Sequence, residues 1–203
     1  MRRNSSSVAV DEDRVVAMSL HGSQPDDIWG VIRCALLLPV YLSQWTLRVH
    51  VSTSSQFVVP DRVLIKLRQL GADIVQVPQT VSSRLPPRLW RLMAGDDMRV
   101  RYFLQRDADW RLGEQEAASV SDWTNKSKSL VVHCVSDRSR QHRLIAGLWG
   151  AQPRLLRARL NGTSLMKLAL DTLTTTGVDV EQRLLESVVW PAVFSDVYWH
   201  ERV

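Results

Sequence analysis

Two aspartates separated by one residue, Asp107 and Asp109, follow directly on the apolar run YFLQR. If the chain bends between them, their carboxylates point the same way, and oxygen ligands of this kind suit Mg²⁺ or Mn²⁺. Such ions keep coordination positions for water and for substrate phosphates. The pair therefore indicates a divalent metal that carries a diphosphate. The alternative is that Asp109 caps a helix beginning near Gly113.

Strand-like and helix-like segments alternate along the chain. Short apolar or alternating runs predict strands at 14–20, 45–52, 72–77, 100–106 and 129–134. Helical spacing, with proline and glycine at the boundaries, predicts helices at 26–42, 60–70, 88–95, 113–123, 164–176 and 180–188. This alternation predicts an α/β fold with a layered, mostly parallel sheet flanked by helices.

The acidic pair has a meaningful position in this order. Asp107 lies at the carboxyl end of the fourth predicted strand, and parallel sheets bind their ligands beyond the carboxyl ends of the strands. No GxGxxG follows the first strand and no GxxxxGK[ST] occurs in the sequence. These absences argue against a Rossmann dinucleotide site and against a P-loop.

Length and charge limit the classes of function. The 203 residues favour one domain, which we place at 14–203, after a polar leader at 1–13 that we expect to be flexible. A net charge of +5 indicates affinity for anions, but the arginines are dispersed and no nucleic-acid-binding motif accompanies them. We therefore expect phosphorylated small molecules as partners and no nucleic acid, which remains the weaker alternative.

The cysteines and the apolar segments indicate the compartment. Cys34 and Cys134 lie far apart in apolar contexts, which favours buried free thiols, as in a cytosolic protein. The amino terminus has no apolar stretch of signal-peptide length, and the segment CALLLPVYL is too short to span a bilayer. The sequence therefore predicts a cytoplasmic protein with no transmembrane segment.

Several motifs, in order and with family-like spacing, resemble a little-described family of GT-A-type glycosyltransferase-like proteins from bacteria, algae and large viruses. Family members read Ser-Leu-Tyr-Gly after the first strand, and later Arg-Asp-X-Asp-Ser-Arg. The likeness covers nearly the whole chain after residue 13. The corresponding segments here are SLHG, LWRLMAGDD, RDADWRLGEQEAASVSDW, VVHCVSDRSRQH, IAGLWGAQP, VDVEQRLLESVVWP and YWHERV.

The resemblance implies a GT-A-like, Rossmann-like sheet that binds a nucleoside diphosphate-sugar. Asp107 and Asp109 would hold Mn²⁺ or Mg²⁺, with His200 as a further ligand. Arg106 and Arg111 would neutralise phosphate charge, a role for which a planar guanidinium is suited. The metal would act as a Lewis acid on the departing nucleoside diphosphate.

The resemblance also implies residues that contact the donor. Ser19, His21 and Gly22 follow the first strand, where such folds receive the nucleotide, and His21 would contact the base or ribose. In GLWG, Gly150 would permit close approach of the backbone to a ligand and Trp149 would offer a platform for a sugar. The alternative for GLWG is a tight turn with a buried tryptophan.

Three residues are candidates for acid-base chemistry. His133 ends the fifth predicted strand and has an ordinary pKa near neutrality, although a histidine there is also a common structural residue. Asp137 lies in the following loop and would orient or deprotonate an acceptor hydroxyl, or would be a solvated turn residue. Glu181 begins a helix, where the dipole favours an acid whatever its chemistry.

The sequence departs from the family pattern at four places, one of which is the segment CVSDRS, where family members read Met-Arg-Asp-His-Pro. The small serine after the acidic pair is Trp110, which either stacks on a base or sugar or blocks the site. The late Asp-Gln is Glu181-Gln182, and the closing His-Asp is His200-Glu201.

We therefore predict a metal-dependent glycosyltransferase that moves a sugar from a nucleoside diphosphate-sugar to an unknown acceptor, with a possible homodimer completing the site. The alternative is a catalytically silent GT-A-like binding or scaffold protein.

Overall fold

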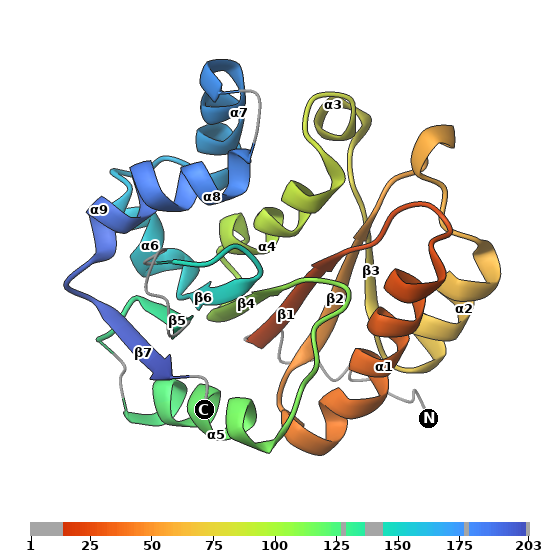
Figure 1. The fold of residues 1–203 in the computed structure, drawn as a ribbon, viewed down its shortest axis with the longest axis horizontal. Coiled ribbons are helices and arrows are strands. Elements are labelled where there is room, and N and C mark those ends of the chain that lie inside the picture. Colours follow the sequence, from red (N-terminus) through yellow and green to blue (C-terminus); the bar gives the residue numbers. More distant parts are fainter. Residues whose placement is uncertain (1–13, 127–128, 137–143, 177–178, 202–203) are drawn as a thin grey trace, which may run out of the picture.

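The computed structural model describes residues 14–126, 129–136, 144–176 and 179–201. This part of the chain forms one seven-stranded sheet, in the order β3-β2-β1-β4-β6-β5-β7 (Figure 1). The strands are β1 (Arg14–Ser19), β2 (Thr46–Val51), β3 (Asp73–Gln76), β4 (Tyr102–Arg106), β5 (Val132–Ser136), β6 (Leu148–Ala151) and β7 (Val197–Glu201).

The sheet is mostly parallel. β1 pairs in parallel with β2 and β4, β2 with β3, and β5 with β7, whereas β6 runs antiparallel to both of its neighbours. All strands except β6 therefore end on one side of the sheet, which we call the carboxyl edge, and begin on the other, the amino edge. The predicted α/β fold with a mostly parallel sheet is confirmed.

Helices cover both faces of the sheet (Figure 1). One face packs on α1 (Pro25–Tyr41), α2 (Asp61–Gln69) and α5 (Glu114–Lys126), and we call it the α5 face. The other packs on η2 (Pro87–Leu92), α4 (Met93–Asp96), α6 (Pro153–Arg159), α7 (Leu165–Thr176) and α8 (Val180–Leu184), and we call it the α8 face. The remaining short elements are η1 (Ser55–Phe57), α3 (Gln79–Ser82), η3 (Leu185–Val189) and α9 (Trp190–Val193).

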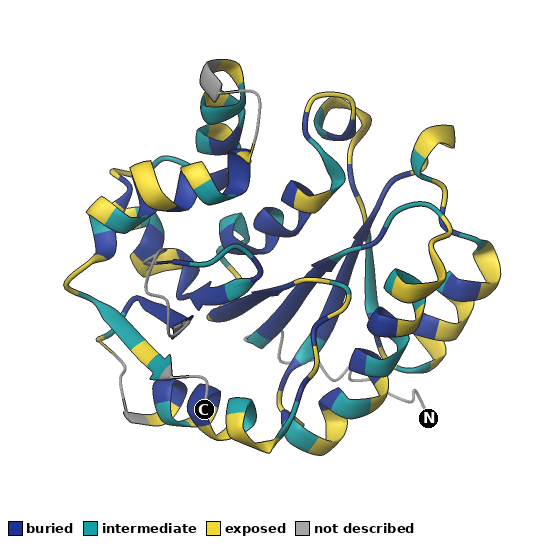
Figure 2. Cartoon of the chain, viewed as in Figure 1, coloured by how far each residue is buried: buried dark blue, intermediate teal, exposed yellow. Residues whose placement is uncertain are grey.

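The central strands are apolar because both of their faces are covered. In β1, Val16 and Met18 enter the core on the α5 face, while Val15 and Ala17 enter the core on the α8 face. Figure 2 shows the inner strands as buried along their length and the outer surfaces of the helices as exposed. Cys34 and Cys134 are buried thiols outside any disulfide, as predicted, and burial raises their pKa values to about 12 and about 11.

Two strands were not predicted, β6 and β7. β6 has only four residues and contains a glycine, so it carries little strand signal. The glycine has a packing reason, because a Cβ at Gly150 would lie 2.4 Å from the carbonyl oxygen of Phe103 on β4. β7 carries the YWHE segment, which the resemblance had suggested as part of a metal site.

No helix in the described ranges is both long and apolar enough to cross a membrane.

Burial of His50 in β2 predicts a loss of stability in mild acid. The ring is almost fully buried and its Nδ1 lies 3.2 Å from the carbonyl oxygen of Met18. Burial lowers the His50 pKa to about 4, so the unfolded chain takes up the proton first as the pH falls below the ordinary histidine pKa. His50 alone should therefore lower the free energy of unfolding by about 2 kcal/mol between about pH 7 and about pH 5, as measured by urea unfolding. Burial also lowers the pKa of His133, so that ring adds a loss of its own, which remains when His50 is replaced.

The control for this prediction is His50→Gln, which removes the titrating ring. The variant should be less stable than the wild type at neutral pH but should lose less stability between the two pH values. An equal loss in both proteins would show that His50 is not the source.

Candidate functional site

The acidic pair lies in a tight turn at the carboxyl end of β4. The carbonyl of Asp107 accepts a hydrogen bond from the backbone NH of Trp110 at 3.1 Å, which closes the turn. Both Asp107 and Asp109 are exposed. Within the described residues the Asp109 carboxylate makes no hydrogen bond, so it does not cap α5 there. The turn presents two carboxylates to solvent at the edge where parallel sheets bind their ligands.

The turn rests on helix α1. A Cβ at Gly30 would lie 1.8 Å from the carbonyl oxygen of Ala108, so only glycine permits this approach. Arg33, one turn later, donates from Nη2 to the carbonyl oxygen of Asp109 at 3.4 Å. The helix after β1 therefore positions the turn after β4.

A buried arginine, Arg91 in η2, joins the acidic turn to helix α8. Its Nη1 donates to Asp107 Oδ1 at 2.6 Å and to the carbonyl oxygen of Arg106 at 2.7 Å. Its Nη2 donates to both oxygens of Glu181, at 3.1 and 3.0 Å. Gln105 Nε2 also donates to Glu181 Oε1. One guanidinium thus holds two carboxylates from distant parts of the chain.

Burial and charge act in opposite directions within this cluster. Burial raises the pKa of Glu181, and the charge of Arg91 opposes the rise. For Arg91, burial alone would lower the pKa, but the charges of Glu181 and Asp107 raise it. Arg91 therefore stays charged, and it offsets part of the cost of burying Glu181.

A second glycine supports Asp107 from the loop before β6. Gly147 has a φ of +76°, and a Cβ there would lie 2.0 Å from Asp107 Oδ2. The carboxylate of Asp107 therefore packs against bare backbone on one side and against Arg91 on the other.

His200 is not brought to the acidic pair. On β7 it pairs in register with Val135 of β5, and its ring stacks on His133 at 6.4 Å, on the α5 face. Asp107 contacts Arg91 on the α8 face. Within the described residues, no group of three histidine, cysteine or acidic side chains is placed to hold a metal ion. The expectation that His200 joins Asp107 and Asp109 is therefore not met in this structure.

His133 lies in the core beneath helix α5. Its Nε2 is 3.0 Å from Ser119 Oγ, and its ring packs between Trp123 and Tyr198. Burial lowers its pKa well below the ordinary value. The ring is inaccessible to a substrate here, which corresponds to the structural alternative for His133. Asp137, the loop acid, lies outside the described residues.

Arg106 and Trp110 turn into the α5 face. The Arg106 guanidinium pairs with Glu116 at 2.6 Å, donates to the carbonyl oxygens of Gln105 and Trp149, and lies 5.2 Å from the Trp110 ring. Trp110 Nε1 donates to Glu116 Oε2 at 2.7 Å. Trp110 is buried, so it neither covers the acidic pair nor offers a face to a ligand. A phosphate contact by Arg106 would require these bonds to break, whereas Arg111 is exposed.

The expected nucleotide residues lie at the carboxyl end of β1. Gly22 has a φ of +67°, and its NH donates to the carbonyl oxygen of Phe57 at 3.1 Å. The His21 ring meets the Phe57 ring edge-on at 6.1 Å. Ser19 Oγ accepts from the backbone NH of Arg91 at 3.1 Å, which ties this edge to the acidic cluster.

A cavity of about 460 Å³ opens beside this loop, between η1 and the segment that follows α3. Its lining is mostly polar and includes the aromatic ring of Phe57. The residues are Ser54, Gln56, Phe57, Gln79, Ser82, Ser83, Arg84, Leu85 and Pro86.

Trp149 belongs to the core and not to the surface. The side chain is fully buried, and it packs edge-on against Phe103 at 5.2 Å. Its neighbour Gly150 allows β6 to approach β4, so the close backbone contact is internal. The structure therefore places Trp149 where a sugar cannot reach it, contrary to the expectation of a sugar platform. It agrees with the alternative of a buried tryptophan.

Sequence reasoning missed Arg91, Gly30 and Gly147 as residues of the site. Arg91 lies in the segment LWRLM, where a cation among apolar residues is the only local signal of burial. The glycines carried no signal beyond their identity, because their neighbours come from distant parts of the chain.

Two carboxylates are a sufficient protein contribution for Mg²⁺ or Mn²⁺ when substrate phosphates supply further ligands. Asp109 is exposed and has no hydrogen bond within the described residues, and Asp107 keeps a half-exposed side chain, at 52%. The donor set of hard oxygens therefore fits such an ion. Arg91 already occupies Asp107 Oδ1, which leaves Oδ2 for coordination.

The fold resembles known glycosyltransferases of the GT-A type. The glycosyltransferase GlyE of Streptococcus pneumoniae matches with a TM-score of 0.56 and 12% identity over 93% of this chain. TarS of S. aureus matches with a TM-score of 0.59 and 10% identity over 92% of the chain. The mannosyltransferase PcManGT of Pyrobaculum calidifontis, whose structure contains GDP-Man and Mn²⁺, matches with a TM-score of 0.53 and 13% identity over 94% of the chain.

These likenesses show that the chain has a GT-A-like fold. The chain spans only about half of the first two relatives, 45% of GlyE and 58% of TarS. No protein-family model matches the sequence, and no curated protein matches it.

Proposed function

We propose that the protein is a metal-dependent glycosyltransferase that uses a nucleoside diphosphate-sugar as donor. The observation that carries the proposal is the exposed turn of Asp107 and Asp109 at the carboxyl end of β4, supported from three sides in a GT-A-like fold. Such support keeps the turn and the Asp107 carboxylate in place before any ligand arrives, which lowers the cost of binding.

The nucleotide is assigned to the carboxyl edge between β1 and β3. His21 and the cavity beside Phe57 offer an aromatic surface with polar groups around it, as a base and ribose require. The diphosphate would then extend toward Ser19 and the acidic turn. Exposed Arg111 is the cation that remains available to a phosphate oxygen, since Arg106 is held by Glu116.

A metal ion bound by Asp107 and Asp109 would supply Lewis-acid stabilisation of the departing diphosphate. In the transfer, the bond between the sugar carbon and the diphosphate oxygen breaks and an acceptor oxygen bonds to that carbon. The acceptor hydroxyl loses its proton to a base, for which Asp137 remains the candidate. Glu181 acts through Arg91, as a positioning residue that fixes Asp107, because both of its oxygens are bonded to Arg91.

Two observations favour the alternative of a catalytically silent GT-A-like binding or scaffold protein. Arg91 neutralises part of the charge of Asp107. His200 stacks on His133, and no group of three possible metal ligands forms among the described residues. Such a protein could bind a nucleotide without a metal and transfer nothing.

The test is the thermal stability of the protein with nucleoside diphosphates and nucleotide sugars, each with and without Mn²⁺. One nucleotide should raise the melting temperature only with Mn²⁺, because a ligand at about 100 times its Kd stabilises the native state by about 2.7 kcal/mol. Asp109→Ala should lose this shift while keeping the melting temperature of the unliganded protein, since the carboxylate has no internal partner in the described residues.

Asp122→Ala is the matched control, since it removes one acid from α5 outside the carboxyl-edge turn. It should keep the metal-dependent shift. A nucleotide shift that needs no metal and survives Asp109→Ala would favour the silent protein, and no shift with any nucleotide would overturn the proposal.

A further inference from the structure

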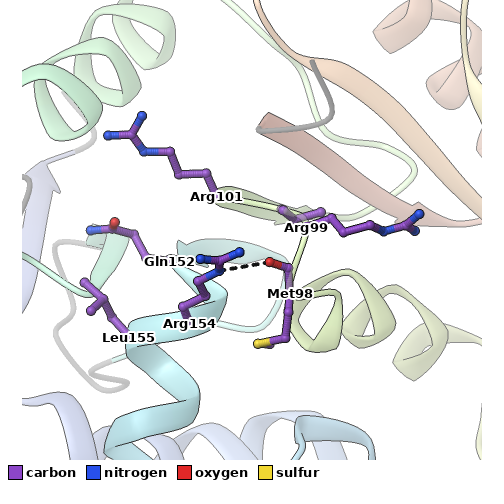
Figure 3. A pocket seen from close by; sticks show the side chains of 7 residues that line it. Met98, Arg99, Arg101, Gln152, Arg154 and Leu155 are labelled. Atoms are coloured by element: carbon purple, nitrogen blue, oxygen red, sulfur yellow. Dashed lines mark hydrogen bonds between the residues drawn. The ribbon is translucent and has the colours of Figure 1, made fainter. Parts of the chain in front are cut away.

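A hollow at the amino edge of the sheet gathers three arginines. It has a volume of about 440 Å³ and lies between the segment that leads into β4 and the start of α6 (Figure 3). We call it the arginine hollow. Its lining residues are Met98, Arg99, Val100, Arg101, Gln152, Arg154 and Leu155.

The positive charge of the arginine hollow is not balanced by acidic residues in its lining. None of the described residues that line it is an acid. Arg99 forms a salt bridge with Asp97, and Arg48 forms a second salt bridge with the same carboxylate. By contrast, neither Arg101 nor Arg154 pairs with a carboxylate in the described part of the chain. Arg101 lies over the Tyr102 ring, 5.4 Å from its centroid. Positive charge that no neighbouring acid balances favours an anion.

The arrangement leaves guanidinium nitrogens available for a ligand. Arg154 donates from Nε to the carbonyl oxygen of Met98 at 3.0 Å. This bond fixes the guanidinium and leaves its two terminal nitrogens, Nη1 and Nη2, available for a ligand. In Figure 3 Arg154 lies between Arg101 and Arg99, and the side chains of these two arginines point away from it in opposite directions. A planar guanidinium can bind two oxygens of one phosphate group.

Apart from Gln152, the rest of the lining is apolar. Met98 comes from the segment before β4 and Leu155, which is 39% exposed, comes from α6, whereas Val100 is buried. The volume lies in the range of small-molecule sites. An inorganic ion would leave the apolar part unfilled, so the ligand that fits has a phosphate group attached to an apolar portion.

The arginine hollow is separate from the proposed donor site. It lies at the amino end of β4, whereas Asp107 follows the carboxyl end of the same strand. The five residues of β4 separate the two edges by roughly 17 Å. A donor bound at the acidic turn would therefore not fill the hollow.

We propose that the arginine hollow is a second ligand site, which binds the phosphate group of an organophosphate with Arg154, joined by Arg101 when its exposed side chain turns toward the phosphate, and packs its apolar portion on Met98 and Leu155. The ligand is either a soluble organophosphate or the headgroup of an anionic lipid. Both sources share the same chemistry, and the experiment separates them.

The soluble arm uses hexyl phosphate, titrated by calorimetry without added metal, with hexanol as the ligand control. The lipid arm uses sedimentation with vesicles of phosphatidylcholine and phosphatidylglycerol. Each arm compares the wild type with Arg101→Gln/Arg154→Gln. The matched control is Arg62→Gln/Arg68→Gln, which removes the same charge from two exposed arginines on α2.

Binding in either arm should weaken roughly tenfold or more in the hollow variant and stay near the wild-type value in the control. Loss of hexyl phosphate binding would identify a soluble source, and loss of vesicle binding alone would identify a lipid. No binding in either arm, or an equal loss in both double variants, would overturn the proposal. The hollow variant should keep any Mn²⁺-dependent nucleotide shift, so the two sites can fail separately.

Discussion

Replacing Arg91 by methionine is expected to lower the free energy of unfolding by about 3–5 kcal/mol, because Glu181 would stay buried without its partner. The side chains of Arg91 and Glu181 are each only 4% exposed, and Glu181 receives two of its hydrogen bonds from Arg91. Methionine fills much of the same volume, so the loss reports mainly on charge. Urea unfolding at neutral pH measures it.

Arg88→Met is the matched control, from the same short helix. Arg88 lies three residues before Arg91, is half-exposed, and reaches Asp179 at 3.8 Å. Exposed pairs of this kind contribute at most about 1 kcal/mol. Similar losses in the two variants would contradict the assignment of Arg91 as the centre of a buried network.

The double variant Arg91→Met/Glu181→Leu distinguishes an unpaired charge from lost packing. With both charged groups removed, part of the stability should return, since buried ion pairs are often replaceable by apolar residues. The metal-dependent nucleotide shift should not return, because Asp107 would still lack the donor that orients it. Losses that simply add would show that the two residues do not act together.

Acid should reduce the loss of stability that Arg91→Met causes. Burial raises the Glu181 pKa, and Arg91 opposes the rise, so the pKa should be higher still in the variant. A carboxyl whose folded pKa is raised contributes stability below its unfolded pKa and loses it as the pH rises. The free energy of unfolding of the variant should therefore approach that of the wild type as the pH falls from about 7 to about 5. The His50 effect is common to both proteins, so it cancels when one free energy is subtracted from the other.

The fold was predictable because burial on two faces gives strands a continuous apolar run. The five predicted strands are present, and Val16 and Leu104 show why, since each lies in the core of a covered sheet. β6 and β7 were not predicted, for a physical reason. In β6, Gly150 is needed for the close approach to Phe103 of β4. A contact between distant segments leaves no periodic pattern in the sequence.

The candidate site was predictable only where the signal is local. Asp107 and Asp109 are two residues apart and follow a strand, so their position could be read directly. Arg91 and Glu181 are 90 residues apart, and their pairing depends on the packing of η2 against α8. The resemblance suggested His200 and Trp149 from order along the chain, but the face of the sheet that a strand residue occupies depends on register.

Gly30→Ala is expected to abolish the metal-dependent nucleotide shift, because the added methyl group would lie 1.8 Å from the Ala108 carbonyl oxygen. That obstacle is backbone, so the turn that carries Asp109 must move away from α1. In a helix interior alanine is favoured over glycine by up to about 1 kcal/mol. Overpacking costs about 1–3 kcal/mol, so the clash should outweigh the gain in helix propensity.

Two measurements on Gly30→Ala give independent answers. Urea unfolding without ligand should show a protein no more stable than the wild type, although propensity alone predicts a more stable one. Thermal unfolding with Mn²⁺ and the selected nucleotide should show that the ligand no longer stabilises it. Gly113→Ala is the control, since a Cβ there meets nothing within 4 Å. If Gly30→Ala were more stable and still bound the ligand, the turn would not depend on α1. If Gly30→Ala were less stable than the wild type but the ligand still stabilised it, the contact would support the fold and not the position of the carboxylates.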